Sequence, residues 1–241
     1  MDTETTEKKA DAMQNFSTPI AIVLAGAIIA GAVYMSGAKL PVTGTQAGAQ
    51  APAPVVNVKD IKISASDPFI GQAGAPLTMV YWADYQCPFC KQFETTVLPT
   101  LMSNYVNTGK MRIVFKDFAF LGNDSTTAAL YGHAIWETYP DKFFAWHEAM
   151  YKAQDAEGDQ GFGNEASILK LIGTIPGMDA SKLKALVAKN KAIYTKELQD
   201  DQQQGAQMGV QGTPGFVVGN QMIAGAVPLA NFKSAIDSQL K

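Results

Sequence analysis

The order of apolar and polar residues from position 56 onward predicts a βαβ unit at the start of a folded domain. Residues 56–63 alternate between apolar and polar side chains, which predicts an edge strand, and the apolar run 77–82 predicts a short buried strand. Residues 88–105 carry apolar side chains at helical spacing, and a second apolar run covers 111–115. Strand, helix and strand in this order give a right-handed crossover with parallel strands.

Residues 124–208 show a helical pattern throughout, which predicts a helical insertion after the βαβ unit. The first two expected helices are rich in aromatic residues, and the last is expected to be divided around Asn190. The four helices are expected at residues 126–136, 142–151, 166–172 and 180–208.

The pattern returns to strands after the insertion. Residues 215–218 and 221–224 are apolar runs separated by Gly219 and Asn220, a pair that favours a hairpin turn. A final helix is expected at residues 228–240. The second half of the domain is therefore expected to be ββα.

The stretch before the domain has a different composition. Residues 1–17 are polar and carry both signs of charge, so we expect a disordered cytoplasmic tail. Residues 18–36 contain an uncharged apolar run of about the length that spans a bilayer, which predicts a transmembrane anchor. Residues 37–55 are rich in Ala, Gly and Pro, a composition typical of a flexible linker. The anchor and the linker would hold the domain, residues 56–241, off a membrane.

A cleaved signal peptide is the alternative to the anchor, because Ser36-Gly37-Ala38 resembles a small-residue cleavage site. The apolar run is longer than the usual signal-peptide core of about 7–15 residues, and the segment before it is not notably basic. The pattern favours an uncleaved anchor and leaves cleavage as an open alternative.

Charge and composition argue against one class of partner. With 47% hydrophobic residues and a net charge of -3, the chain of 241 residues has an ordinary composition for a folded protein. Its lysines are scattered, and no basic stretch is interleaved with aromatic residues. We therefore expect no nucleic-acid partner.

The two cysteines of the chain, Cys87 and Cys90, lie where the expected 77–82 strand gives way to a helix. A cysteine at a helix N-terminus faces free backbone N–H groups and the positive end of the helix dipole, which stabilise a thiolate. Pro88 suits the first helical position and so places Cys87 at the N-cap. A C-x-x-C pair in this position lowers a thiol pKa into the range of roughly 3.5–7.5. We therefore expect Cys87 to be the reactive sulfur and Cys90 to be more buried and to resolve the bond that Cys87 makes.

Other uses of the cysteine pair are less well supported. A zinc site needs about four ligands, and His133 and His147, the only imidazoles, lie far along the chain at no metal-ligand spacing, so no metal is expected. A structural disulfide across so short a loop would constrain the unfolded chain little. Both histidines are expected to be packing or surface residues. Lys116 and Asp117 are expected to form a solvated pair and are given no role.

Three stretches carry a resemblance to a known family: Asp67–Gly71, Asp84–Cys90 with its C-P-F-C sequence, and Val210–Gly219 with its Gly-Thr-Pro-x-Phe sequence. Together with the βαβ, insertion and ββα order, they resemble the DsbA-like branch of the thioredoxin-fold thiol-disulfide oxidoreductases, which are membrane-anchored or secreted in bacteria. The resemblance covers roughly residues 56–241. It implies an α/β thioredoxin fold with a helical insertion between its two halves.

The resemblance also implies roles for particular residues. Thr213-Pro214 is expected to contain a cis bond that faces the cysteines, beside an open strand edge where an extended substrate pairs with the backbone. Pro88 and Phe89 form the active-site dipeptide. Asp84 matches a residue common in this branch, with a turn or capping role as the alternative. Many relatives carry a buried acid six residues before the first cysteine, where this chain has Tyr81, whose role stays open.

These expectations combine into a membrane-tethered enzyme that introduces disulfides into proteins outside the cytoplasm, on the periplasmic or outer cell-surface side. No bound cofactor is expected, since the Cys87–Cys90 disulfide carries the electrons, and the resemblance implies reoxidation by a quinone-linked membrane partner. A reductase or isomerase of the same fold is one alternative. A tethered peptide-binding or chaperone module without redox turnover is the other.

Overall fold

The computed structural model of the chain describes residues 56–156 and 161–240. The expected tail, membrane anchor and linker at residues 1–17, 18–36 and 37–55 lie outside the described residues. Within 56–156 and 161–240, no helix combines the length and the apolar character that crossing a bilayer requires.

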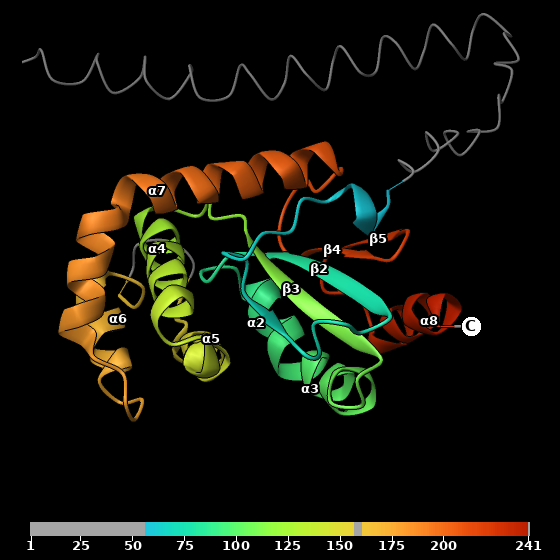
Figure 1. Ribbon diagram of the computed structural model, residues 1–241, viewed down its shortest axis with the longest axis horizontal. Helices are drawn as coiled ribbons and strands as arrows, with labels where there is room; N and C mark the ends of the chain where they lie inside the picture. The colour runs from blue at the N-terminus through green and yellow to red at the C-terminus, as the bar shows by residue number, and fades with distance from the viewer. Residues whose placement is uncertain (1–55, 157–160, 241) are drawn as a thin grey trace, which may run out of the picture. The chain divides into compact units, whose positions relative to one another are not determined.

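A five-stranded sheet with the order β1-β3-β2-β4-β5 organises the domain (Figure 1). The central strand β2 runs parallel to β3 and antiparallel to β4, and the β4–β5 pair forms the expected hairpin. The βαβ and ββα halves are confirmed. The strands are β1 (Phe69–Ile70), β2 (Leu77–Ala83), β3 (Met111–Asp117), β4 (Gly215–Val218) and β5 (Gln221–Ala224).

The expected edge strand at residues 56–63 is wrong. This segment contains a short 3-10 helix, η1 (Val58–Asp60), because the Asn57 side chain accepts a hydrogen bond from the Lys59 N–H and turns the chain. The alternation reflects two apolar side chains, Val56 and Ile61, that are buried against one face of the sheet. The edge position beside β3 belongs to β1.

Two helices cover the face of the sheet that leads to the cysteines. Phe93 of α2 (Pro88–Thr96) packs against Phe216 of β4, with ring centroids 4.6 Å apart. Phe232 of α8 (Leu229–Gln239) lies 5.2 Å from Phe93. In the view of Figure 1, α2, α3 and α8 lie below the sheet and α7 runs above it.

The helix expected over residues 88–105 is interrupted. After α2 the chain forms α3 (Leu98–Leu101) and a single π-helical turn, η2 (Met102–Val106), with Val97 as the junction. Pro99 is the physical cause, because it has no N–H to donate to the preceding turn and its ring crowds that turn.

The helical insertion between β3 and β4 is confirmed. Its last helix is continuous, so the division expected around Asn190 is wrong, although Figure 1 shows that this helix bends along its length. The Asn190 amide donates to the Tyr194 hydroxyl at 3.1 Å, instead of competing for the helix backbone. The elements are α4 (Asn123–Thr138), η3 (Pro140–Lys142), α5 (Phe143–Ala153), α6 (Glu165–Ile172) and α7 (Ala180–Gln207).

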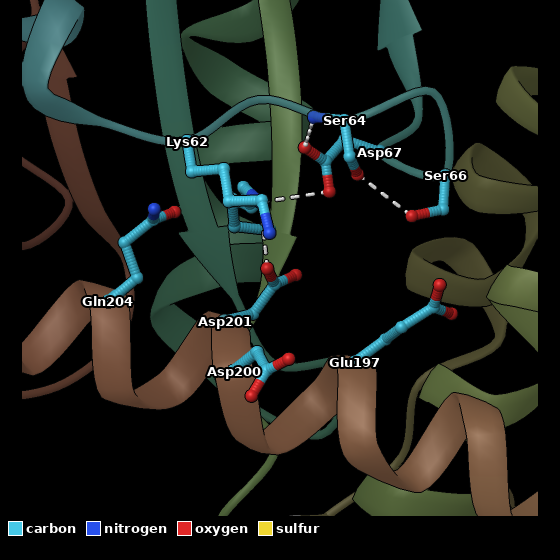
Figure 2. A pocket seen from close by; sticks show the side chains of 9 residues that line it. Lys62, Ser64, Ser66, Asp67, Glu197, Asp200, Asp201 and Gln204 are labelled. Carbon is cyan, nitrogen blue, oxygen red and sulfur yellow. Dashed lines mark hydrogen bonds and ion pairs between the residues drawn. The ribbon is translucent and has the colours of Figure 1, made fainter.

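Lys116 is buried, and the expectation of a solvated Lys116–Asp117 pair is wrong. Its Nζ lies 2.8 Å from Asp67 Oδ1 and 2.8 Å from Asp201 Oδ1, with all three side chains largely shielded from water. Figure 2 shows Asp67 and Asp201 reaching this point from the loop before β1 and from α7. Asp201 also accepts a hydrogen bond from the Asp117 N–H at 3.1 Å. Since a buried charge is stable only when paired, these contacts fix α7 to the end of β3.

Candidate active site

The cysteine pair lies where the sequence placed it, at the junction of β2 and α2. Cys87 is the N-cap of α2 and Pro88 is its first residue. A turn leads into the helix, and the Cys87 N–H donates to the Asp84 carbonyl at 3.1 Å. Both cysteines are free thiols in this structure. Cys90 is fully buried and Cys87 is 4% exposed.

The two thiols have opposite pKa shifts. The pKa of Cys87 is lowered to about 6, mainly by a hydrogen bond from the Cys90 thiol and further by Thr213 and by the N–H groups of Cys90 and Phe89, against the opposing effect of burial. The pKa of Cys90 is raised well above its usual value, first by burial and then by Cys87. At neutral pH the pair therefore holds its negative charge on Cys87, the sulfur at the helix N-terminus.

The Thr213–Pro214 bond is cis, and it lies beside the Cys87 sulfur. The Cys87 thiol contacts the Thr213 carbonyl oxygen at 3.4 Å. The Thr213 hydroxyl is buried and has no hydrogen-bond partner in the part of the chain that the structure describes. The loop 209–215, together with Met222 and Ala224, lines a groove of about 270 Å³. A shallow, partly apolar surface thus adjoins Cys87.

The buried carboxylate of Asp84 fixes the loop between β2 and α2 through hydrogen bonds. Its carboxylate accepts four hydrogen bonds, from the N–H groups of Gln86, Phe120 and Leu121 and from the Ser125 hydroxyl, and no sulfur is among its partners. Burial raises the pKa of Asp84, and these donors oppose the rise. The contacts join the loop before the cysteines to the start of α4 and favour the turn and capping role.

Tyr81 is completely buried behind Cys90. Its ring stacks on Phe216 with centroids 4.8 Å apart. Its hydroxyl makes no hydrogen bond of ordinary geometry to any described residue, but it lies close enough to Cys90 to lower the pKa of that thiol. Burial, followed by the Cys90 charge, raises the pKa of Tyr81. A neutral hydroxyl therefore occupies the position where the resemblance expects an acid.

Sequence reasoning missed Gln154, which follows α5 and supports the active-site loop. Its buried amide donates to the Tyr85 carbonyl at 2.7 Å and to the Cys87 carbonyl at 3.0 Å. The Lys91 ammonium donates to the Gln154 carbonyl at 2.7 Å. A single glutamine after a helix gives no signal in a sequence, since its role depends on a contact with a loop far back in the chain.

The two histidines lie in separate polar clusters. His147 is buried, with Nε2 2.9 Å from Glu94 Oε1 and Nδ1 2.9 Å from the Tyr85 hydroxyl. The sequence analysis also missed Glu94. It follows Cys90 by four residues, which places the two side chains on one face of α2. His133 is buried as well, with nitrogens 3.0 Å from Asp117 and 3.2 Å from Glu197. Neither histidine is a surface residue.

A family model described as thioredoxin matches residues 64–238 of the chain. This match covers the sheet, the cysteine pair and the helical insertion. The chain therefore belongs to the thioredoxin family.

Named relatives and solved structures refine this assignment. The chain is 29% identical over 177 residues to the probable disulfide bond formation protein D of Bacillus anthracis, which covers 71% of this chain and 77% of the relative. It is 28% identical over 178 residues to the disulfide bond formation protein D of Bacillus subtilis, covering 72% and 77%.

The fold matches two solved structures of this kind over most of their length. Oxidised BdbD from Bacillus subtilis superposes with a TM-score of 0.67 at 25% identity, covering 73% of this chain and 93% of that one. A periplasmic thioredoxin-like protein from Salmonella enterica serovar Typhimurium gives 0.59 at 26% identity, covering 73% and 91%. The chain is a DsbA-like thiol-disulfide oxidoreductase. Enzymes of this class use a redox-active disulfide as their electron carrier, without an external cofactor.

Proposed function

We propose that the chain forms disulfide bonds in protein substrates outside the cytoplasm, with Cys87 as the sulfur that exchanges with substrate and Cys90 as the resolving sulfur. The observation that carries this proposal is the environment of Cys87, an N-cap thiol with a pKa of about 6 beside a buried Cys90. The disulfide bond formation activity named for the Bacillus relatives supports the oxidising direction.

The proposed reaction begins from the oxidised Cys87–Cys90 pair. A substrate thiolate attacks the Cys87 sulfur, and Cys90 leaves as a thiolate that takes up a proton. A second substrate thiolate then attacks the substrate sulfur of this mixed disulfide, and Cys87 leaves. Two electrons pass from the substrate to the enzyme, which ends as a dithiol. The low pKa of Cys87 makes it a good leaving group and stabilises the reduced enzyme.

We assign substrate docking to the groove beside Thr213 and Pro214. An extended substrate would pair its backbone with that of Thr213, as in β-strand addition. The groove of about 270 Å³ and the 60% exposed side chain of Phe89 support this assignment, because both offer apolar contact close to Cys87.

The membrane anchor at residues 18–36 and the linker at residues 37–55 belong to the proposal as well. They would tether the domain on the extracytoplasmic side, where a quinone-linked membrane partner would reoxidise Cys87 and Cys90. The apolar composition of the anchor segment and the periplasmic relative from Salmonella support this location.

A reductase or isomerase is the second candidate, and the same thiol supports it. A pKa of about 6 for Cys87 lies between the values of about 3.5 for a strongly oxidising and about 7 for a reducing member of the superfamily. Cys87 would then attack substrate disulfides, and Cys90 would resolve the product.

The reduction potential of the full-length chain, equilibrated in glutathione buffers, separates these candidates. A value near about −120 mV supports disulfide formation, and a value near about −270 mV favours the reductase. Cys87→Ser should abolish oxidation of a reduced model protein without unfolding the chain. If the unaltered chain exchanges no disulfides with the model protein but binds it, and Cys87→Ser binds it equally well, the chain acts as a binding module and both redox candidates are wrong.

A further inference from the structure

A cavity beside the helical insertion is not used by the disulfide chemistry. It has a volume of about 610 Å³ and opens between α4, α7 and the segment before β1. Sites for small organic molecules usually have volumes of roughly 300–1,000 Å³. Among the described residues, none from the cysteine motif or from the Thr213–Pro214 loop lines this cavity. It is therefore a candidate for a second binding site.

Trp136 of α4 forms an aromatic wall of the cavity and is held firmly in place. Its indole N–H donates to the Ala65 carbonyl at 3.0 Å. The indole ring also makes edge contacts with Phe69 and Phe143, at centroid distances of 5.5 and 5.7 Å. Trp136 is nevertheless only partly buried, so part of its ring is available to a ligand.

Tyr194 of α7 supplies a second aromatic ring to the cavity. This ring stacks on the His133 imidazole with centroids 5.6 Å apart, and its hydroxyl donates to Glu137 Oε2. The contacts hold both aromatic side chains in position before any ligand arrives. Binding would therefore cost little side-chain entropy on the side of the protein.

Ile193 forms an exposed apolar rim next to Tyr194. Its side chain is 59% exposed, and it is one of three large apolar side chains that the described part of the chain leaves exposed. A single exposed isoleucine is ordinary on a protein surface, but this one borders a cavity that already holds two aromatic rings. The apolar body of a ligand would lose contact with water against all three side chains.

Glu137 places a carboxylate at the same cavity. The Tyr194 hydroxyl and the Asn190 amide, the latter at 3.4 Å, both donate to its Oε2. No donor from residues 56–156 and 161–240 forms a hydrogen bond with its other oxygen, Oε1. A carboxylate that its neighbours orient in this way is a ready acceptor for an ammonium group, and such charge-assisted hydrogen bonds are strong.

The charges around the cavity favour a cation. Glu197 also lines it and lies 3.2 Å from His133, which is protonated at neutral pH because its pKa is raised to about 10. Asp117 lies on the other side of the imidazole, at 3.0 Å. With Glu137, three carboxylates surround one imidazolium. Figure 2 shows the adjoining cavity, which Glu197 shares with the further carboxylate of Asp200. A cation would be attracted to this surface and an anion repelled.

We propose that the cavity between α4 and α7 binds a small organic cation, an ammonium group carried on an apolar ring. The ammonium donates to Glu137 Oε1, and the ring packs against Trp136, Tyr194 and Ile193. This ligand differs in chemistry from the protein thiols that exchange with Cys87. The site goes beyond the proposed function and takes no part in disulfide exchange.

The test titrates phenethylammonium into the oxidised full-length chain and follows binding by calorimetry. Neutral phenethyl alcohol and anionic hydrocinnamate have nearly the same shape and serve as the comparison. We expect the ammonium to saturate one site with a dissociation constant below about 1 mM, the alcohol to bind roughly fivefold more weakly, and the anion not to bind. Tryptophan fluorescence should change in parallel, because Trp136 lines the cavity whereas Trp82 and Trp146 are fully buried.

Two substitutions locate the bound ammonium. Glu137→Gln should weaken binding of phenethylammonium about fivefold and leave that of the alcohol unchanged, whereas Ile193→Ala should weaken both. Both side chains are exposed, so neither change should unfold the chain. Glu148→Gln is the matched control, because it removes the same charge from an exposed carboxylate that pairs with Lys152 on α5. It should bind phenethylammonium as the unaltered chain does.

Three results would overturn the proposal: no saturable binding of phenethylammonium, equal affinities for the ammonium and the alcohol, or equal losses in Glu137→Gln and Glu148→Gln. The last would show that the overall charge of the chain attracts the cation instead of this cavity. The titrations do not depend on Cys87 or Cys90. Their failure would leave the redox candidates standing, and failure of those candidates would leave this site standing.

Discussion

At the scale of single residues, the chemistry depends on the few groups that surround the Cys87 sulfur. The Cys90 thiol and backbone N–H groups at the start of α2 stabilise its thiolate, and burial opposes them. The helix position could be predicted from Pro88. The contact of the Cys87 thiol with the Thr213 carbonyl oxygen, at 3.4 Å, joins residues 126 positions apart and therefore depends on the whole fold.

The alkylation rate of the reduced chain should follow ionisation of Cys87. We expect a half-maximal rate near pH 6, the value to which its pKa is lowered. Cys90→Ala removes the largest stabilising contact, so the midpoint should move up toward the ordinary thiol value of about 8.5. An unchanged midpoint in this variant would mean that the helix N-terminus alone lowers the pKa.

Asp84 should matter for stability rather than for sulfur chemistry. Asp84→Ala leaves the buried Gln86 N–H and Ser125 hydroxyl without their acceptor, so we expect the free energy of unfolding to fall by about 3 kcal/mol in urea titrations. Asp141→Ala is the control, because the Asp141 side chain is 76% exposed and should have little effect. A large shift in the alkylation midpoint of Asp84→Ala would instead point to a direct role at the thiol.

At the scale of secondary structure elements, the Lys116 ion pairs fasten α7 to the sheet. Lys116→Met would leave the Asp67 and Asp201 carboxylates buried without their cation. Removing one partner of a buried ion pair costs about 3–5 kcal/mol, and we expect a loss of this size in the free energy of unfolding.

Lys152→Met on α5 is the comparison for Lys116→Met, because it removes a lysine from an exposed ion pair instead of a buried one. Its ammonium pairs with Glu148 at 2.7 Å, but both side chains are exposed, so the loss should stay below about 1 kcal/mol. Equal effects of the two substitutions would show that α7 is held by its apolar contacts alone.

Local signals decided which elements could be predicted. The βαβ order, the helical insertion and the β4–β5 hairpin followed from apolar periodicity and from turn residues such as Gly219 and Asn220. The errors came from single residues that override periodicity. Pro99 interrupts a helical pattern, and Asn57 turns a segment that alternates like a strand.

At the scale of the whole molecule, His133 joins three elements that are distant in the sequence. It lies on α4 and contacts Asp117 at the end of β3 and Glu197 on α7. Burial acts to lower the pKa of His133, but the two carboxylates outweigh it and raise the pKa to about 10. The folded chain therefore binds this proton more tightly than the unfolded chain does.

This shift predicts a pH dependence of stability. The contribution of His133 is fully present below its unfolded pKa of about 6.5 and is lost as the pH rises through about 10. The free energy of unfolding should therefore fall across this window in the oxidised protein, where Cys87 does not titrate. His133→Gln should fall less steeply in the same urea titrations, and parallel curves for the two proteins would contradict the assignment.

The active site was predictable only in part, because some of its residues come from distant segments of the chain. The cysteines, Asp84 and Thr213-Pro214 lie in short motifs that a sequence displays. Their supports, such as Gln154 and His147, come from the insertion and reach the site only through tertiary packing. A buried histidine and a surface histidine look alike in a sequence.

The distance along the chain between Cys87 and Thr213 has a consequence for biosynthesis. A ribosome delivers the N-terminal part first, so the cysteine pair emerges long before the insertion and the loop of Thr213. Until those parts arrive, the pair lacks the packing that buries Cys90 and the contact between Cys87 and the loop of Thr213. A nascent chain would thus expose both sulfurs, and the enzyme would gain its buried Cys90 and the groove beside Pro214 only near the completion of translation.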